Sequence, residues 1–279
     1  MKTAVLITPN HPDDSSQAVR ESAAAAREAG VELVATPEEH RKHGDAAADV
    51  TTVEVLPESP DLCLVLGGDG SILYALRRYA GTEVPVFGIN FGTIGFLAAA
   101  ERDQLRDGLE RAFSGRFEVM TLPGLELGSG QGAALNDITF IRQPQGRVAE
   151  LSYRIADQEV GHVRCDGLVA ATPAGSTGYN LANAGPILAW GVEGYVVSFI
   201  APHTLTARAL VVAPDDVLHV RNAAGREPVE IELDGDRSSQ LEPGDEIEVR
   251  FRNGIGRLAQ IEGANFYQRI REKFGRLAR

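Results

Sequence analysis

Apolar runs of strand length alternate with helical patterns along the first 115 residues of the chain. The runs span Thr3 to Thr8, Val31 to Ala35, Leu62 to Leu66 and Val84 to Ile89. Helical patterns extend from about Ser15 to a stop at Gly30, over Ser71 to Tyr79 and around Arg102 to Phe113. Strands separated by helix-length segments predict crossover connections, and therefore an α/β domain with a parallel sheet. The polar, acidic stretch after Ala35 predicts a loop that continues to Val50.

Beyond Arg116 the pattern changes to short alternating or β-branched runs separated by Gly, Pro and Asp. These runs are Ala149 to Ile155, Tyr195 to Ile200, Val217 to Val220, Val229 to Leu233 and Glu246 to Phe251. They predict a β-rich, sandwich-like second domain. An apolar stripe then recurs at helical spacing, at Phe266, Ile270, Phe274 and Leu277. We expect an α/β domain over 1–115, a β-rich domain over 116–264, and a final helix at 265–279 that packs back on the first domain.

Charge and composition narrow the classes of function. The 279 residues include 43% apolar and 24% charged residues, which is an ordinary globular balance. A formal net charge of −12 argues against binding along a nucleic-acid backbone, which needs clustered basic residues. Lysine occurs only at Lys2, Lys42 and Lys273, and the P-loop pattern G-x-x-x-x-G-K-[ST] does not occur. Any bound phosphates would then be held locally by arginine, backbone amides and a metal ion.

The sequence also bears on the cellular compartment. No apolar stretch approaches the roughly 20 residues that cross a bilayer, and Met1 to Asn10 has no basic leader or cleavage site. We expect a cytoplasmic protein that contacts neither membrane nor nucleic acid. Cys63 and Cys165 lack the spacing of a disulfide framework or a zinc site, and we expect two reduced, buried thiols.

The sharpest local motif is Gly67-Gly68-Asp69-Gly70-Ser71, between a predicted buried strand and a predicted helix. Glycines at such a junction let backbone amides approach phosphate oxygens, and the helix N-terminus favours negative charge. A carboxylate in that place would repel phosphates unless it binds a metal ion or takes a proton from an attacking hydroxyl. Asp69 therefore indicates phosphoryl transfer, although a tight turn capped by an aspartate is the alternative.

Three further segments carry polar groups suited to a ligand. Asn90-Phe91-Gly92-Thr93-Ile94-Gly95-Phe96-Leu97 again places glycines beside a polar residue after a strand. The stretch from Asp166 to Asn180 ends a strand at Thr172-Pro173 and continues into a loop of small residues with one tyrosine. Its hydroxyls, amides and ring could bind an adenine edge and face. Asn136-Asp137 could bind neighbouring ribose hydroxyls or simply form an Asx turn.

These motifs, in this order, resemble the NAD kinase family. The matching segments are GGDGS, NFGTIGFL, LNDITF, RCDGLVAATPAGSTGY, APHTLTARALVVAP and LDGD. The resemblance covers nearly the whole chain from about residue 60, and the segment from DGL to STGY is the most specific part. It implies transfer of the terminal phosphoryl group of ATP or polyphosphate to the adenosine-ribose 2′-hydroxyl of NAD, which forms NADP.

The resemblance also implies roles for individual residues. Asp69 matches the proton acceptor, the pair Asn136 and Asp137 matches the residues that bind the NAD ribose, and Asp166 matches the acid at the nicotinamide end. The full set of expected substrate-binding residues is Gly68, Gly70, Asn90, Phe96, Asn136, Asp137, Arg164, Asp166, Ala174, Thr177, Gly178, Tyr179, Asn180, Leu181, Ala182 and His203. The stretch from Thr177 to Ala182 is expected around the adenine.

Further implications concern the assembly and the metal ion. Arg164 matches a basic residue that reaches NAD from a neighbouring subunit in related structures, so a homodimer or homotetramer is expected. His203 matches a pocket-side histidine. Mg²⁺ or another divalent ion would arrive with the triphosphate, without fixed protein ligands. The chain departs from the family pattern at Ala174, Gly178, Ala182 and Asp236, where Thr or Ser, Ala, Ser and Gln are usual.

Two alternatives remain open from the sequence alone. A lipid or sugar kinase could share the GGDG motif, but it gives no reason for an adenine-shaped loop at Thr177 to Tyr179. A non-catalytic NAD-binding sensor is the other alternative, and the intact Asp69 speaks against it. Phosphorylation of NAD in the presence of ATP and Mg²⁺ would separate all three.

Overall fold

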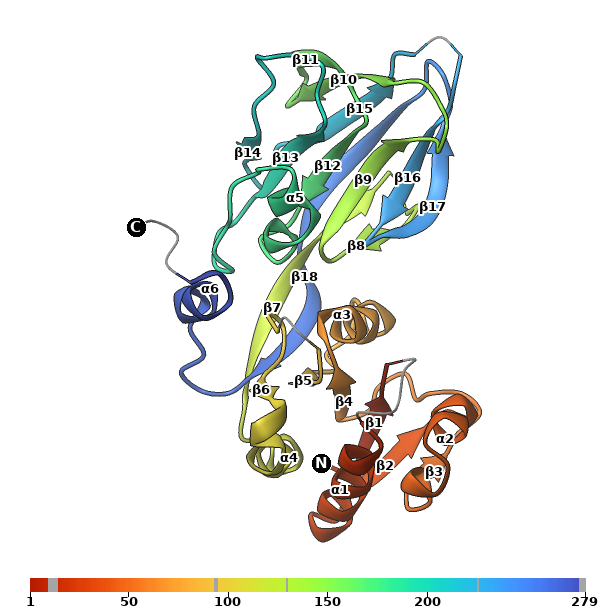
Figure 1. The fold of residues 1–279 in the computed structure, drawn as a ribbon, viewed down its shortest axis with the longest axis vertical. Helices are drawn as coiled ribbons and strands as arrows, with labels where there is room; N and C mark the ends of the chain where they lie inside the picture. The colour runs from red at the N-terminus through yellow and green to blue at the C-terminus, as the bar shows by residue number, and fades with distance from the viewer. Residues whose placement is uncertain (10–14, 93–94, 129, 225, 276–279) are drawn as a thin grey trace. The chain divides into compact units, whose positions relative to one another are not determined.

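The computed structural model describes residues 1–9, 15–92, 95–128, 130–224 and 226–275. The chain divides into two compact units (Figure 1). Unit 1 comprises Met1–Thr121 and Gly256–Arg279, and unit 2 comprises Leu122–Ile255. Two long strands, β7 (Glu118–Leu127) and β18 (Glu246–Gln260), each contribute residues to both units.

Unit 1 is built on a parallel sheet with the order β5-β4-β1-β2-β3. Its strands are β1 (Thr3–Ile7), β2 (Glu32–Ala35), β3 (Thr51–Thr52), β4 (Leu62–Gly67) and β5 (Val86–Asn90). Beyond β5 the sheet gains β6 (Ala100–Glu101) and the end of β18, where Leu258 pairs with Val86. The fully apolar runs match strands that are buried on both faces. The predicted α/β architecture is confirmed.

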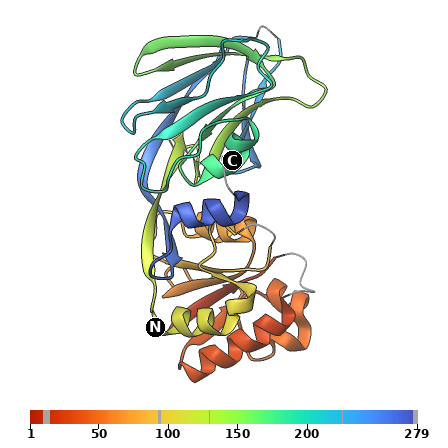
Figure 2. The ribbon, with the colours of Figure 1, turned by 60° about the vertical axis from the view of Figure 1, so that its left-hand side comes forward.

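Helices cover both faces of this sheet. On one face, α1 (Ser16–Glu28) and α4 (Leu105–Ser114) lie side by side (Figure 2) and share a core with Leu64, Phe87 and Ile89. On the other face lies α3 (Asp69–Arg78), whose Ile72 sits where a side chain at Gly88 would project. A glycine in mid-strand therefore allows α3 to pack directly on β5.

The stretch between Ala35 and Val50 is helical, so the predicted loop is wrong there. It forms α2 (Pro37–His43) and a 3₁₀ turn, η2 (Gly44–Ala47). Proline opens α2, acidic residues fill its first turn and basic residues its last. These charges interact favourably with the helix dipole and stabilise the helix. A helix of seven residues is too short to display an apolar period. Helix α3 begins at Asp69 rather than at the predicted Ser71.

Unit 2 packs two antiparallel sheets around one core. The first has the order β14 (Leu210–Val212), β13 (Tyr195–Ile200), β12 (Gly167–Ala171), β9 (Asp137–Arg142), β16 (Val229–Leu233) and β17 (Asp236–Leu241). The second has the order β11 (Gln158–Cys165), β10 (Ala149–Ile155), β15 (Leu218–Asn222) and β18, with β7 and β8 (Ala133–Ala134) beside β18. Phe140 and Leu168 of the first sheet and Leu151 and Leu218 of the second belong to one buried cluster. The predicted sandwich-like domain is confirmed.

The final helix, α6 (Phe266–Phe274), packs on unit 1 as expected. The Asn265 side chain caps it by accepting hydrogen bonds from the amides of Tyr267 (2.9 Å) and Gln268 (3.3 Å). The ring of Phe274 lies 5.4 Å from that of Phe96. Leu277, the last member of the predicted stripe, lies outside the described residues. Among the residues that are described, no helix is long and apolar enough to cross a membrane.

The short helical pieces that remain are η3 (Arg102–Gln104), η4 (Gly175–Thr177) and α5 (Tyr179–Ala182). Both cysteines are buried free thiols, as expected from their spacing.

Candidate functional site

The Gly-rich turn of unit 1 sits where β4 ends and α3 begins. Gly68 is the N-cap residue, and Asp69 opens the helix. A Cβ atom at Gly67 would lie 2.7 Å from the side chain of Ser71, and one at Gly92 would lie 3.0 Å from the Cα atom of Gly68. The two Gly-rich segments thus approach each other through bare backbone, which larger residues would prevent.

The Asp69 carboxylate is held by the second of these segments. Its Oδ2 accepts a hydrogen bond from the Phe96 amide (2.9 Å), and its Oδ1 accepts one from the Leu97 amide (3.0 Å). Burial raises the pKa of Asp69, while those two amides and the positive charges of Arg269 and Lys273 oppose the rise. The result is a fixed carboxylate whose affinity for a proton exceeds that of an exposed aspartate.

Asn90 and Phe96 shape the loop around Asp69. The buried Asn90 side chain donates to Glu101 Oε2 (2.7 Å) and accepts from the Gly92 amide (2.9 Å). A Cβ atom at Gly95 would lie 2.6 Å from Asn90 Nδ2, so glycine is required there. Phe96 is buried. Asn90 and Phe96 were expected to bind substrate, and the contacts observed for both are made within unit 1.

A cavity of about 520 Å³ lies beside the Gly-rich turn. Gly70 and Ser71 line it, together with Thr8, Glu39 and Lys42. Lys42 Nζ lies 3.1 Å from Glu39 Oε1, and the Thr8 hydroxyl bonds both Glu39 and His43. Lys42 is a cation at this cavity, and it was not among the residues expected to bind substrate.

In unit 2, Asn136 and Asp137 occupy a segment held by one distant carboxylate. Asp234 accepts hydrogen bonds from the backbone amides of Leu135 (3.0 Å), Asn136 (2.6 Å) and Asp137 (3.1 Å). Asp234 and Gly235 join β16 to β17 with φ values of 52° and 83°. That pair of left-handed residues forms the tight hairpin turn for which Asp-Gly is favoured. The turn thereby directs a carboxylate onto three successive amides.

Asp137 is the most strongly perturbed acid of this segment. Its side chain is only 7% exposed, and its Oδ1 accepts a hydrogen bond from the Thr139 hydroxyl (3.1 Å). Burial, followed by the negative charge of Asp234, raises the pKa of Asp137 to about 7. Near neutral pH this carboxyl group can therefore either donate or accept a hydrogen bond.

The loop after β12 packs against the same segment. The Thr172 hydroxyl donates to the Leu135 carbonyl (2.6 Å), and the Thr172 amide donates to the Asn136 carbonyl (2.9 Å). Any side chain at Gly175 would overlap the Asn136 carbonyl group. The structure thus brings two predicted motifs together, although about 40 residues of chain separate them.

Within that loop, the predicted residues differ in accessibility. Gly178, Tyr179 and Ala182 are exposed, and Thr177 and Leu181 are half-buried. Ala174 and Asn180 are buried, and Asn180 Nδ2 donates to the carbonyls of Ser176 and Pro186, both at 3.0 Å. Partial burial and the charges of Glu232, Asp137 and Asp166 raise the pKa of Tyr179, so its phenol stays neutral at physiological pH. The exposed side of the loop offers a ring, backbone amides and little steric bulk.

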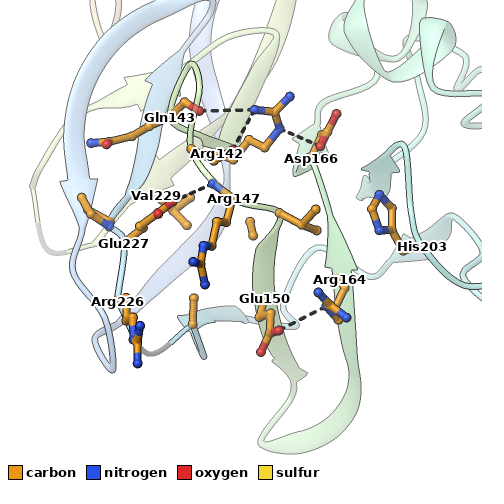
Figure 3. A pocket seen from close by; sticks show the side chains of 15 residues that line it. Arg142, Gln143, Arg147, Glu150, Arg164, Asp166, His203, Arg226, Glu227 and Val229 are labelled. Carbon is orange, nitrogen blue, oxygen red and sulfur yellow. Dashed lines mark hydrogen bonds and ion pairs between the residues drawn. The ribbon is translucent and has the colours of Figure 1, made fainter.

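Three other predicted residues line one cavity of about 710 Å³ in unit 2 (Figure 3). They are Arg164, Asp166 and His203. Asp166 Oδ1 accepts from Arg142 Nε (2.7 Å), Arg164 Nε lies 3.1 Å from Glu150 Oε1, and the His203 amide donates to the Arg164 carbonyl (2.8 Å). The Arg164 side chain remains 61% exposed. Arg147 and Arg226 add positive charge to the same cavity.

Several residues that shape these sites were not among those expected to bind substrate. They are Lys42 at the cavity of unit 1, Asp234 in the hairpin, Arg142 beside Asp166, and Gln260 and Arg269 behind the loop that follows β5. Asp234 had a usable signal, because its Asp-Gly pair lies between two strand-like runs. Within the described parts of the chain, no group of three or more His, Cys, Asp or Glu is arranged to hold a metal ion.

Comparison with known proteins gives consistent matches along the chain. The family model for the ATP-NAD kinase N-terminal domain matches residues 14–117, and that for the ATP-NAD kinase C-terminal domain matches residues 135–254. NAD kinase from Symbiobacterium thermophilum is 36% identical over 229 residues, which cover 78% of this chain and 81% of the relative. NAD kinase from Syntrophotalea carbinolica is 30% identical over 273 residues, which cover 95% of each chain.

Two solved structures share the fold. Yeast NADH kinase complexed with NADH has a TM-score of 0.86 at 22% identity, covering 100% of this chain and 90% of the yeast chain. An NAD kinase from Archaeoglobus fulgidus in complex with ATP has a TM-score of 0.73 at 24% identity, covering 99% and 98%.

Proposed function

The chain belongs to the NAD kinase family, and we propose that it transfers the terminal phosphoryl group of ATP to the adenosine-ribose 2′-hydroxyl of NAD, which forms NADP. The observation that carries this reaction is the Asp69 carboxylate, fixed by two backbone amides at the start of α3. Family membership makes the protein an NAD-phosphorylating enzyme, and the fixed carboxylate supports a specific role within it.

In this proposal Asp69 is the general base. It takes the proton from the 2′-hydroxyl as that oxygen bonds to the γ-phosphorus, while the bond from the γ-phosphorus to the bridging oxygen breaks and ADP leaves. The raised pKa of Asp69 supports the role, because burial strengthens the carboxylate as a proton acceptor. Mg²⁺ bound to the triphosphate would neutralise charge on the phosphates.

The ATP phosphates would bind at the Gly-rich turn of unit 1. Gly68 and Gly70 leave the backbone accessible, and Lys42 supplies a positive charge at the adjoining cavity. The Archaeoglobus fulgidus relative was solved with ATP, which favours a nucleotide donor here. Inorganic polyphosphate carries the same phosphate chemistry and is the alternative donor. Asn90 and Phe96 would support this region mainly by holding the loop.

Unit 2 would bind NAD. Asn136 and Asp137 would bond the ribose hydroxyls, and Tyr179 with its neighbouring loop amides would contact the adenine. Asp166 would contact the nicotinamide end, and His203 would lie at the side of the pocket. The large exposed fraction of Arg164 supports its proposed contact with NAD in a neighbouring subunit, and therefore a homodimer or homotetramer. We also propose a cytoplasmic location.

A panel of donors and acceptors tests the reaction. Purified protein with Mg²⁺ is offered ATP or polyphosphate as donor, and NAD, NADH or NAD lacking the adenosine 2′-hydroxyl as acceptor. We expect NADP from ATP and NAD, and we expect the deoxy analogue to inhibit without being phosphorylated. Phosphorylation of that analogue would show that a different hydroxyl is the acceptor.

A further inference from the structure

Arg269 on α6 binds the back of the loop that holds Asp69. Its Nη1 donates to the carbonyls of Phe96 (2.8 Å) and Ala98 (2.6 Å) and makes a longer contact with that of Gly95 (3.4 Å). Its Nη2 donates to Gln260 Oε1. A partly buried guanidinium that donates to several backbone carbonyls holds those carbonyls in place.

The carbonyls that bind Arg269 and the amides that bind Asp69 belong to the same peptide groups. The Gly95 carbonyl shares a planar peptide bond with the Phe96 amide, and the Phe96 carbonyl shares one with the Leu97 amide. In a trans peptide the oxygen and the hydrogen point in opposite directions. A guanidinium on one side of these two groups therefore orients, and polarises, the two N–H groups that meet the carboxylate on the other side.

Gln260 completes the support. Its Nε2 donates to the Leu97 carbonyl (2.9 Å), and the side chain is buried. Residues 95 to 98 thus have all four of their carbonyl oxygens within reach of Arg269 or Gln260. Both supporting side chains come from the C-terminal part of unit 1.

We propose that Arg269 is a positioning residue for Asp69, acting through the peptide groups between Gly95 and Leu97. The inference rests on the proposed role of Asp69 as the base in NAD phosphorylation. Arg269 also brings a permanent positive charge near the carboxylate. Among the residues that the structure describes, the charges that act on the pKa of Asp69 are those of Arg269 and Lys273, both on α6, and each lowers it.

The test compares Arg269→Gln with two neighbours on the same helix. Arg271→Gln removes an exposed arginine and controls for charge, and Ile270→Ala shortens a buried apolar side chain of α6 while Arg269 is kept. We expect Arg269→Gln to lower kcat by at least about tenfold, the scale of a small misplacement of a catalytic group. The KM values for NAD and ATP should rise much less, and Arg271→Gln should behave as wild type.

The pH profile separates positioning from general support of the fold. Removing the positive charge raises the pKa of Asp69, so the acid limb of kcat should move to higher pH in Arg269→Gln. It should stay in place in Ile270→Ala, even where the thermal stability of the two variants is equally reduced. An equal loss of kcat in Ile270→Ala, or an unmoved acid limb in Arg269→Gln, would overturn the proposal.

A chemical rescue experiment and amide hydrogen exchange test the proposal if Arg269→Gln folds poorly or if turnover cannot be measured. If Arg269→Gln folds poorly, Arg269→Ala is assayed with added guanidinium or methylammonium ions. Recovery of kcat with guanidinium alone supports the proposal, and no recovery refutes it. Amide hydrogen exchange of residues 95–98 needs no turnover, and it should quicken in Arg269→Gln but not in Arg271→Gln. A wild-type protein that does not phosphorylate NAD would reject the proposed function and leave the exchange result standing.

Discussion

Replacing Asp137 by asparagine should change how the stability of unit 2 depends on pH. The carboxyl group is almost fully buried, and its pKa rises from an ordinary value of 3.8 to about 7. Asparagine keeps the shape and can still accept the hydrogen bond from Thr139, but it never ionises. Wild type and variant therefore differ mainly in the cost of placing a negative charge next to Asp234.

The direction in which stability changes with pH follows from the number of protons bound in the folded and unfolded states. Between about pH 4 and pH 7 the unfolded chain has lost the Asp137 proton while the folded chain keeps it, so wild-type stability falls as pH rises. At 1.36 kcal/mol per pH unit, the full interval corresponds to about 4 kcal/mol. Relative to wild type, Asp137→Asn should thus gain up to about 4 kcal/mol of unfolding free energy between pH 4 and pH 8.

The measurement is urea unfolding at several pH values, followed by tryptophan fluorescence. The chain has a single tryptophan, Trp190, which lies in unit 2, so the signal reports on the unit that contains the change. Asp245→Asn, an exposed aspartate of the same unit, serves as the control and should shift stability by less than about 0.5 kcal/mol at every pH. A stability difference between Asp137→Asn and wild type that stays constant from pH 4 to pH 8 would refute the reasoning.

Three other outcomes are expected. Asp69→Asn should lower kcat, measured by a coupled NADP assay, by a factor of at least about 10². The affinity for NAD, measured by titration, should change by no more than a few-fold. Near-normal turnover would show that Asp69 is not the base. Arg164→Ala should raise the KM for NAD about tenfold, and mixing it with Asp69→Asn should restore some activity after subunit exchange if the neighbour's arginine completes each site. Asp234→Asn, which suits the left-handed backbone, should destabilise unit 2 by roughly 1–3 kcal/mol and raise the KM for NAD, because one of its oxygens no longer accepts from backbone amides.

Three strands of unit 2 were predictable to the residue, whereas the bounds of the apolar strands of unit 1 differ from the prediction by one or two residues. β10, β13 and β16 have the predicted bounds, because burial on a sheet face fixes both composition and length. β18 was predicted only as far as Phe251, although it continues to Gln260. Two glycines, Gly254 and Gly256, interrupt the pattern there, and the continuation depends on pairing with strands made far earlier in the chain.

The motifs of the site were readable from the sequence, but their supports were not. Asp69 meets amides 27 and 28 residues away, whereas Asp234 binds an amide 99 residues away and Arg269 a carbonyl 173 residues away. Local patterns carry no information about such pairs, because only the fold brings them together. Asn180 was expected to bind substrate because it lies in a ligand-like loop, and nothing in the local sequence indicated that its side chain is buried.

Unit 1 is formed by two separate stretches of the chain, and the ribosome synthesises them at different times. Residues 256–275, which supply the end of β18, Gln260 and Arg269, are synthesised only after the whole of unit 2. At about 5–20 residues per second, the ribosome adds this segment on the order of ten seconds after the rest of unit 1 has been made. During that interval Val86 of β5 and the loop around Phe96 lack the partners that this segment supplies. The supports that Arg269 and Gln260 give to the Asp69 loop are therefore complete only when the last helix has docked.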